Sequence, residues 1–402
     1  FYDEDIQQGL LKIKNWNFFR DLSNYKLDWA VLENGKIIES GTIKELDIQP
    51  QQTQKIFIPF KAQFDNSKEY FLNLSIKLKK SEPFLDADYE IAYHQFLLKP
   101  LTPIDLTPLL KNETLDKIAK EGSVTLSNQN VKVNFNTNAG TIESYIFKGD
   151  TLLLKGGQVN FWRAPVDNDY GANTQNIYRE WLTAGKEEKI LSFESRKINN
   201  GGYLLHFKKD ILGGDASYLQ SYSLYPDGRI QITNELIAHA DTVTEGNRIP
   251  EKAKHSNMYK FGNEHTLPEH FKGVSWYGRG PFESYADRKD AAIVGLYNSS
   301  VKELNHMYAR PQESGNRSDV RWVKLFNEKG GSLTFVADEL MHFSASNFKT
   351  ADLDSGQNKK DTQAHGKLMA PRQEVYLNID GFSSGVACVN SWGALPLPQY
   401  ML

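Results

Sequence analysis

The sequence predicts an all-β protein, and three observations support this class. Aromatic residues make up 12% of the 402 residues, with 19 Tyr and 22 Phe, and strands favour aromatic side chains. Apolar and polar residues alternate in many short segments, as they do in half-buried strands. An Asn-Gly and an Asp-Gly pair each separate two such segments, which is typical of hairpins. We expect two domains, at residues 1–100 and 122–402, joined by a linker over residues 101–121.

The first domain is predicted to be a small immunoglobulin-like β-sandwich. Leu27, Trp29 and Val31 alternate with polar residues, and Asn34-Gly35 supplies a hairpin turn. Further strands are expected at residues 54–60, 70–78 and 89–98. About seven strands in about a hundred residues suit such a sandwich.

The linker is predicted from a change in composition. Pro100, Pro103 and Pro108 interrupt any regular element. The residues that follow, 112–120, are polar and are expected to form at most a transient helix. A boundary between two domains is therefore placed here.

From Val124 onward the pattern predicts one strand after another. Val131, Val133 and Phe135 alternate with polar residues, and Asp227-Gly228 marks a second hairpin. One helix is expected at residues 176–184, with Ile177, Trp181 and Leu182 on one face. The charged, irregular stretch at 242–256 is expected to be a loop.

Composition narrows the classes of function. The net charge is −3 with both signs interspersed, which argues against a partner that is nucleic acid or an anionic membrane. Apolar runs stay far below the roughly 20 residues of a membrane span.

The single cysteine, Cys388, rules out a disulfide framework or a multi-cysteine metal site. Its apolar neighbours predict a buried core residue. The chain begins at Phe1, without an initiator Met or a signal-like segment, and this fits either a processed chain or the tail of a larger polypeptide.

Four long motifs occur in order over about 230 residues. Residues 161–171 read FWRAPVDNDYG and residues 274–288 read VSWYGRGPFESYADR. Residues 310–322 read RPQESGNRSDVRW, and LNIDGF at 377–382 is followed by SWG at 391–393. Together they resemble the C-terminal sandwich domain of the family 2 glycoside hydrolases of β-galactosidase type.

The resemblance implies a fold and a role. It implies an immunoglobulin-like spacer followed by a large galactose-mutarotase-like β-supersandwich. In that family two glutamates of an upstream barrel hydrolyse the β-galactoside, one as the acid and one as the nucleophile. This chain would then be the non-catalytic C-terminal part of a bacterial-type β-galactosidase, cytoplasmic or periplasmic. It would brace the barrel, bind carbohydrate and complete the sugar pocket. A stand-alone carbohydrate-binding module and a structural or homo-oligomerisation segment are the alternatives.

Trp392 is the first candidate for sugar contact. Its Ser, Gly and Pro neighbours predict a loop, and a flat indole complements the apolar face of a pyranose. The resemblance also implies that an aromatic residue of this segment reaches the barrel pocket. A core or interface tryptophan is the alternative.

Glu313, Asn316 and Arg317 are the second set of candidates, since their polar groups suit sugar hydroxyls. The alternative is a structural network that joins this loop to the turn at Gly278-Arg279-Gly280-Pro281, with Glu283 and Arg288 as the charged ties.

Asp167 and Asp169 offer alternating oxygen ligands that suit calcium or magnesium. This is a weak signal, and a turn capped by Asx hydrogen bonds is favoured over it. We expect no other cofactor.

Three further observations limit the interpretation. Glu264 follows Asn263 as a catalytic glutamate would, but it lacks a second carboxylate motif and we reject it. An aldose epimerase would need a His acid and a Glu base; His206, His239 or His306 could supply the first. The chain also departs from the family at residues 260–262, where Lys-Phe-Gly replaces Arg-x-Gly, and at Ser284, where Asn is common.

Overall fold

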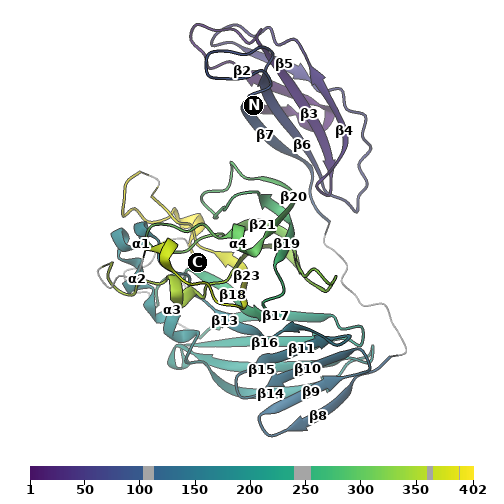
Figure 1. The fold of residues 1–402 in the computed structure, drawn as a ribbon, viewed down its shortest axis with the longest axis vertical. Helices are drawn as coiled ribbons and strands as arrows, with labels where there is room; N and C mark the ends of the chain where they lie inside the picture. Colours follow the sequence, from purple (N-terminus) through teal and green to yellow (C-terminus); the bar gives the residue numbers. More distant parts are fainter. Residues whose placement is uncertain (103–112, 240–254, 360–364, 389) are drawn as a thin grey trace. The chain divides into compact units, whose positions relative to one another are not determined.

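The computed structural model describes residues 1–102, 113–239, 255–359, 365–388 and 390–402. The chain divides into two compact units, residues 1–104 with 293–296 and residues 105–292 with 297–402. Regular structure in the described residues is mainly β-strand (Figure 1), so the prediction of an all-β fold is confirmed. Within the described residues, no helix is both long and apolar enough to span a membrane.

The first unit contains two antiparallel sheets that share one core. One sheet has the order β1–β2–β5, with β1 at Tyr2–Asp5, β2 at Leu10–Lys14 and β5 at Thr53–Phe57. The other has the order β4–β3–β6–β7, with β3 at Tyr25–Glu33, β4 at Lys36–Ile43, β6 at Tyr70–Leu78 and β7 at Glu90–Lys99. Leu27, Trp29 and Val31 of β3 are buried against Leu11 and Ile13 of β2. The alternation in the sequence therefore marked the inner face of this sandwich.

The hairpin between β3 and β4 forms at the predicted turn. Asn34 and Gly35 both have positive φ angles, 46° and 80°, as a two-residue type I′ turn requires. The second predicted hairpin, at Asp227-Gly228, lies between β16 and β17, which pair as antiparallel neighbours.

The second unit contains a large sheet and a four-stranded sheet. The large sheet has twelve strands in the order β20–β19–β21–β22–β23–β18–β13–β11–β10–β9–β8, with β12 paired to β11. Its strands are β8 Asp116–Lys120, β9 Ser123–Ser127, β10 Val131–Asn136, β11 Thr141–Phe147, β12 Asp150–Leu153, β13 Lys155–Asn160, β18 Lys260–Leu267, β19 Gly273–Gly280, β20 Ile293–Ser300, β21 Arg317–Phe326, β22 Ser332–Ser346 and β23 Val375–Ser383. The four-stranded sheet is β14 Lys189–Lys197, β15 Tyr203–Ile211, β16 Ala216–Leu224 and β17 Ile230–Ala238.

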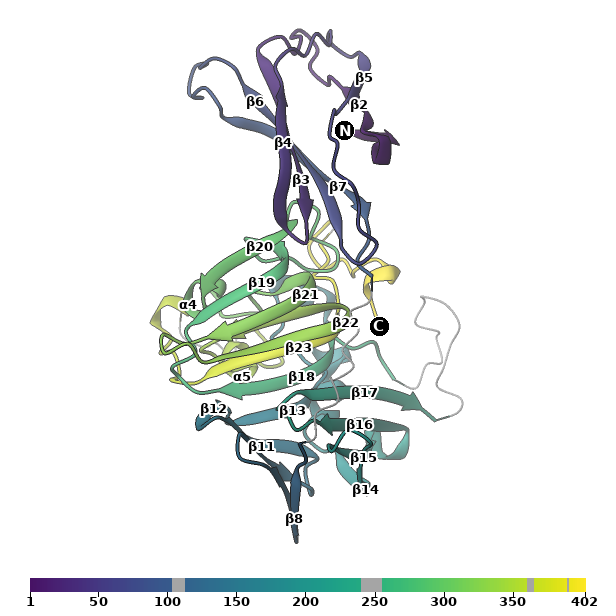
Figure 2. The same cartoon turned by 90° about the vertical axis from the view of Figure 1, so that its right-hand side faces the viewer.

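The two sheets of the second unit pack against each other. Leu205 and Phe207 of β15 and Tyr222 of β16 share a core with Val133 and Phe135 of β10. Figure 2 shows β18, β23, β22, β21 and β19 side by side as the rest of the large sheet. The predicted strand at Val131, Val133 and Phe135 is confirmed, and these three side chains are at most 1% exposed.

Short helices cluster at one end of the second unit (Figure 1). They are α1 Asp167–Ala172, α2 Thr174–Ile177 and α3 Arg179–Ala184, with α4 Val301–Leu304 and α5 Thr350–Leu353 elsewhere. The single helix predicted at 176–184 was therefore wrong in its bounds, because Tyr178 separates two short helices. Trp181 is buried as expected, whereas Ile177 is 49% exposed.

Two other expectations need correction. Residues 116–120, predicted as the end of the linker, form the edge strand β8 paired with β9. All five side chains are exposed, so backbone pairing and not apolar burial defines this strand. Residues 103–112 of that linker and 240–254 of the predicted loop lie outside the described residues. Cys388 is exposed instead of buried, because β23 ends at Ser383 and Cys388 follows in irregular backbone with a φ of 67°.

Candidate functional site

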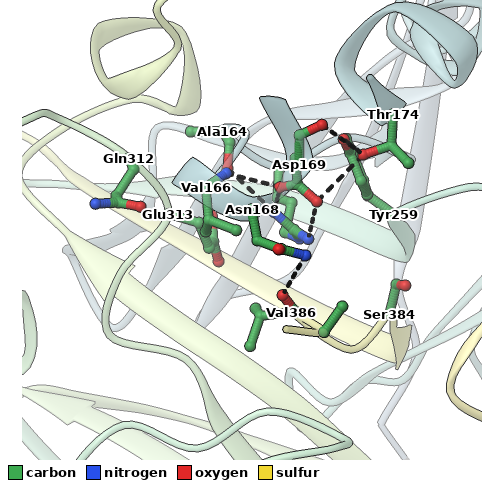
Figure 3. A network of polar contacts seen from close by, with 12 residues as sticks. Ala164, Val166, Asn168, Asp169, Thr174, Tyr259, Gln312, Glu313, Ser384 and Val386 are labelled. Atoms are coloured by element: carbon green, nitrogen blue, oxygen red, sulfur yellow. Dashed lines mark hydrogen bonds and ion pairs between the residues drawn. The ribbon is translucent and has the colours of Figure 1, made fainter. Parts of the chain in front are cut away.

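The candidate site is built on the segment that connects β13 to α1. Phe161 and Trp162 are buried, with Phe161 packed edge-on against Trp181. Asp169, in the first turn of α1, accepts a hydrogen bond from the backbone N–H of Val166 at 2.7 Å. That bond satisfies one of the free donors at the start of the helix and fixes the direction of α1. Figure 3 shows Asp169 and Val166 at the centre of the polar contacts.

A buried ion pair holds this segment to the core. Arg163 is fully buried and contacts Asp169 through two hydrogen bonds, Nη1–Oδ2 at 2.5 Å and Nη2–Oδ1 at 3.1 Å. Burial by itself favours the neutral form, but Asp169, Tyr259 and Glu313 together outweigh it and raise the pKa of Arg163. The guanidinium carbon also lies 4.3 Å from the ring centroid of Tyr259. The Tyr259 hydroxyl is 2.8 Å from Thr174 Oγ1, so α2 is held by the same cluster (Figure 3).

Helix α1 in turn holds the Trp392 loop, which we define as residues 390–395. Asn168 accepts from the backbone N–H of Gly393 at 2.7 Å and donates to the Ala394 carbonyl at 2.8 Å. The indole N–H of Trp392 donates to the Asp167 carbonyl at 3.2 Å. Three hydrogen bonds therefore fix this loop on one short helix.

The Trp392 indole lies against the backbone of Gly171. A Cβ atom at Gly171 would stand 2.8 Å from the indole atom Cε2, so only glycine allows this approach. Trp392 nevertheless remains 65% exposed. A large aromatic side chain that is anchored at its polar edge and open to solvent is suited to stacking on a ligand.

Charged and amide groups surround the indole. Lys359 Nζ lies 5.5 Å from the ring centroid of Trp392 and 2.6 Å from Asp167 Oδ1. Arg310 donates to the Lys359 carbonyl at 2.9 Å, and its Nε is 3.8 Å from Asp167 Oδ1. Gln312 accepts from the Asp167 N–H at 3.1 Å. The site therefore combines an aromatic platform with hydrogen-bond donors, as sugar sites do.

The predicted cation ligands have other partners. Asp169 pairs with Arg163, and Asp167 faces Lys359. Within the part of the chain that the structure describes, no group of three His, Cys, Asp or Glu side chains could hold a metal ion. Binding of calcium or magnesium here stays a prediction, and it would require the displacement of both protein cations.

Asn316 and Arg317 point into the protein and not toward solvent. Asn316 is 0% exposed and donates to the Ser284 carbonyl at 2.7 Å. Arg317 is 4% exposed and donates to the carbonyls of Gly315, Leu304 and Pro281 at 2.7, 3.1 and 2.9 Å.

Glu313 is also buried, at 6% exposure, and lies 3.3 Å from Lys260 Nζ, which is 3.2 Å from Asp380. The three side chains therefore fit the structural network that was the alternative, and in this arrangement they offer a sugar no accessible polar group.

The ties of this network are those expected around the Gly278 turn. Glu283 accepts from Arg288 Nη2 at 3.1 Å and from the backbone N–H of Gly315 at 2.9 Å. Glu283 therefore ties this region to the loop at Gly315, whereas Arg288 pairs with Glu283 itself. Ser284, where the family commonly has Asn, accepts from the Ser318 N–H at 3.0 Å, so this departure keeps a hydrogen bond.

The structure also places the candidates for the rejected catalytic glutamate and for the epimerase alternative. Glu264 lies within β18 and is half-buried. His206 Nδ1 is 2.8 Å from Ser221 Oγ, and His306 packs edge-on against Tyr308. His239 Nε2 is 2.8 Å from Ser217 Oγ. The contact that sequence reasoning missed is the Lys359 cation beside Trp392, since 33 positions separate the two residues and no motif covers Lys359.

Comparison with known proteins decides the family. The family model described as "Beta galactosidase small chain" matches residues 127–402. This is more than half of the chain. The chain belongs to the β-galactosidase small-chain family. A second model, "Beta-galactosidase, domain 4", matches residues 11–99, which covers the first unit.

Curated relatives agree with this assignment. The chain is 29% identical over 402 residues to the beta-galactosidase of Priestia megaterium, covering 99% of this chain and 36% of the relative. It is also 29% identical to that of Photobacterium profundum, covering 99% and 38%, and 26% identical to that of Lactobacillus delbrueckii subsp. bulgaricus, covering 99% and 37%. The chain therefore spans little more than a third of the length of these relatives. It is a β-galactosidase-related segment.

Among solved structures, the galactosidase domain of alpha-galactosidase-sucrose kinase, AgaSK, aligns with 66% of this chain and 38% of that chain, at 10% identity and a TM-score of 0.32.

Proposed function

We propose that this chain is the supporting part of a β-galactosidase and that it presents Trp392 to the sugar bound by the catalytic region. The observation that carries the proposal is the exposure of Trp392, 65%, on a loop fixed by three hydrogen bonds to α1. An exposed indole loses little entropy on binding when its loop is already ordered. The chain's place in the small-chain family supports a galactoside as the ligand.

The chemistry of hydrolysis is assigned to residues outside this chain. Retaining hydrolysis needs two carboxylates about 5 Å apart on either side of the glycosidic bond. The resemblance places that pair in an upstream barrel, and the chain corresponds to about a third of its curated relatives. We therefore propose that the chain alone does not hydrolyse β-galactosides and that its partner is the catalytic portion of the same enzyme.

The test is hydrolysis of a chromogenic β-galactoside by the chain alone and after mixing with the separately expressed upstream portion. We expect no activity alone and restored activity on mixing. The variant Trp392→Ala should raise KM by about tenfold, the value of one lost stacking contact of roughly 1.4 kcal/mol. Trp392→Phe keeps an aromatic ring and should restore part of the loss.

The same variant separates the alternatives. A carbohydrate-binding module would show a loss of sugar affinity in the isolated chain. A purely structural or homo-oligomerisation segment would show unchanged KM and unchanged affinity. Activity of the chain alone would contradict the proposal and direct attention to Glu264.

A further inference from the structure

A cavity of about 590 Å³ in the second unit has a polar floor made by the large sheet. Gln158 and Asn160 of β13 are two residues apart and so lie on the same face of that strand. Glu264 of β18 is the cross-strand partner of Gln158, and all three line the cavity. The floor continues by hydrogen bonds, since Asn160 donates to Asn378 at 2.9 Å.

Two groups of helical residues form the walls. Arg179, Trp181 and Leu182 of α3 line one part, and Thr350 of α5 and Asp354 line another. The two tryptophans of the lining are already oriented by other contacts. The Trp162 indole N–H donates to Asp354 at 3.0 Å, and that of Trp181 donates to the Ser256 carbonyl at 2.9 Å. Both side chains are almost fully buried, at 2% and 5% exposure, so they pack behind the cavity wall and hold it in place.

Two charged groups of opposite sign in this cavity are left without a partner. The Arg179 guanidinium has no hydrogen bond or ion pair among the residues that the structure describes, and its Nη1 atom is buried. The Glu264 carboxylate has no hydrogen-bond or ion-pair partner in the same set of residues. Burial raises the pKa of Glu264, although Lys349, Lys155 and Lys260 oppose the shift. Both side chains are half-buried, and a partly desolvated polar group without a partner gains from a ligand that pairs with it.

The charges of the lining residues determine which class of ligand fits the cavity. A metal cation would suit Glu264 but would face Arg179 and the lysines of the lining, Lys155, Lys186 and Lys349. A simple anion would suit Arg179 but would approach Glu264. A ligand satisfies both groups only if it carries its anionic group and its hydroxyl donors on different atoms.

We infer that this cavity binds an acidic monosaccharide, a uronate or a sugar phosphate, whose anionic group pairs with Arg179 and whose hydroxyl groups donate to Glu264. The apolar part of the sugar ring faces Leu182, which lines the cavity beside the polar floor. A cavity of this size is within the range of about 300–1,000 Å³ for small-molecule sites. Trp392 is not among the lining residues, so the inference does not depend on the function proposed above.

The test is calorimetric titration of the full chain with galacturonate and with galactose 6-phosphate, using galactose and inorganic phosphate as matched probes. At least one acidic sugar should bind at least about tenfold more tightly than either probe, because a charge-assisted pair adds that much. Which of the two binds more tightly distinguishes a carboxylate from a phosphate. Binding of galactose or inorganic phosphate with equal affinity, or of neither acidic sugar, would overturn the inference.

Variants locate the site. Arg179→Gln should weaken binding of the acidic sugar about tenfold or more, and Glu264→Gln should weaken it by a smaller factor. Two control variants should leave the affinity for the acidic sugar unchanged. They are Arg196→Gln, at an exposed arginine of β14, and Trp392→Ala. Thermal unfolding should be unaltered by Arg179→Gln, because the guanidinium has no partner to lose. If Arg179→Gln does not fold, the site is tested by Glu264→Gln and by the affinity of the wild-type chain for the acidic sugar relative to galactose. Unchanged affinity for the acidic sugar in either folded variant would contradict the assignment.

Discussion

The Trp392 loop and the loop at residues 313–317 differ in one physical respect. Both lie in motifs that carry the family resemblance, and both were candidates for sugar contact. Trp392 is 65% exposed, whereas Asn316 and Arg317 are 0% and 4% exposed. The polar groups of the second loop are directed at backbone carbonyls of its own neighbourhood. Polar density in a loop therefore indicates a network of hydrogen bonds, and only exposure separates a binding surface from a structural one.

The largest effect is expected from the ion pair beneath the Trp392 loop. Arg163→Met should lower the free energy of unfolding by about 3–5 kcal/mol, because Asp169 would remain as a buried, unpaired charge. Urea denaturation measures this loss. Arg196→Met is the matched control, since Arg196 is exposed on β14, and it should change stability by less than about 0.5 kcal/mol. Equal stability of the two variants would show that the pair does not support the site.

Arg317→Met tests the buried loop. We expect a loss of about 2–3 kcal/mol, because the carbonyls of Gly315, Leu304 and Pro281 lose their donor. Burial also lowers the pKa of Arg317 to about 10, so the arginine remains charged at neutral pH. The KM for a β-galactoside should stay within about twofold of wild type in the folded protein. A large rise in KM without loss of stability would return this loop to the sugar site.

Acidification should weaken the buried region. Burial lowers the pKa of His265 and of His342 to about 4, from 6.5. Between these values the unfolded chain binds protons that the folded chain does not, so stability falls as pH falls from 6.5 to 4. Burial raises the pKa of Asp380 to about 6 from 3.8, which acts in the opposite direction over pH 4–6. Burial also raises the pKa values of Glu188 and Glu264, which act in the same direction as Asp380. Each histidine by itself contributes a slope of at most about 1.4 kcal/mol per pH unit.

Urea denaturation at pH 6.5, 5.5 and 4.5 checks the sign of this slope. The variant Asp380→Asn removes the opposing group and should steepen the loss. An equal change in stability between pH 6.5 and pH 4.5 in Asp380→Asn and in the wild-type chain would contradict the opposing role of Asp380.

The smallest effect is expected at Lys359, beside the exposed indole. Lys359→Met should change stability by less than about 0.5 kcal/mol, because its pair with Asp167 is partly exposed. It should change KM by about two- to threefold through the lost cation next to Trp392. Steady-state kinetics of the enzyme that contains this chain would detect it, and an effect larger than that of Trp392→Ala would mean that the lysine and not the indole contacts the sugar.

Much of the fold was accessible from local sequence signals. The Asn34-Gly35 and Asp227-Gly228 turns and the alternation at Val131, Val133 and Phe135 are local properties, and each was correct. Long-range pairings had no such signal. Lys260, Glu313 and Asp380 meet in the core from three separate segments, and their burial depends on how the strands pair.

Exposure was the part of the site that sequence reasoning did not settle. Cys388 follows the apolar residues of its segment, yet it is exposed because the strand has already ended. Arg163 and Asp169 lie in one motif, but nothing in their spacing distinguishes an ion pair from a turn cap. In both cases the exposure and the partner of the side chain depend on the path of the backbone outside the motif.

The most direct test of the central claim compares two exposed aromatic residues from different motifs. Trp392 is 65% exposed and Phe282 is 49% exposed. The measurement is KM for a chromogenic β-galactoside with the enzyme containing this chain, as wild type, Trp392→Ala or Phe282→Ala. We predict a rise of about tenfold for Trp392→Ala and a change of less than twofold for Phe282→Ala. Equal KM values for Trp392→Ala and wild type would contradict the claim that the Trp392 loop presents the sugar platform.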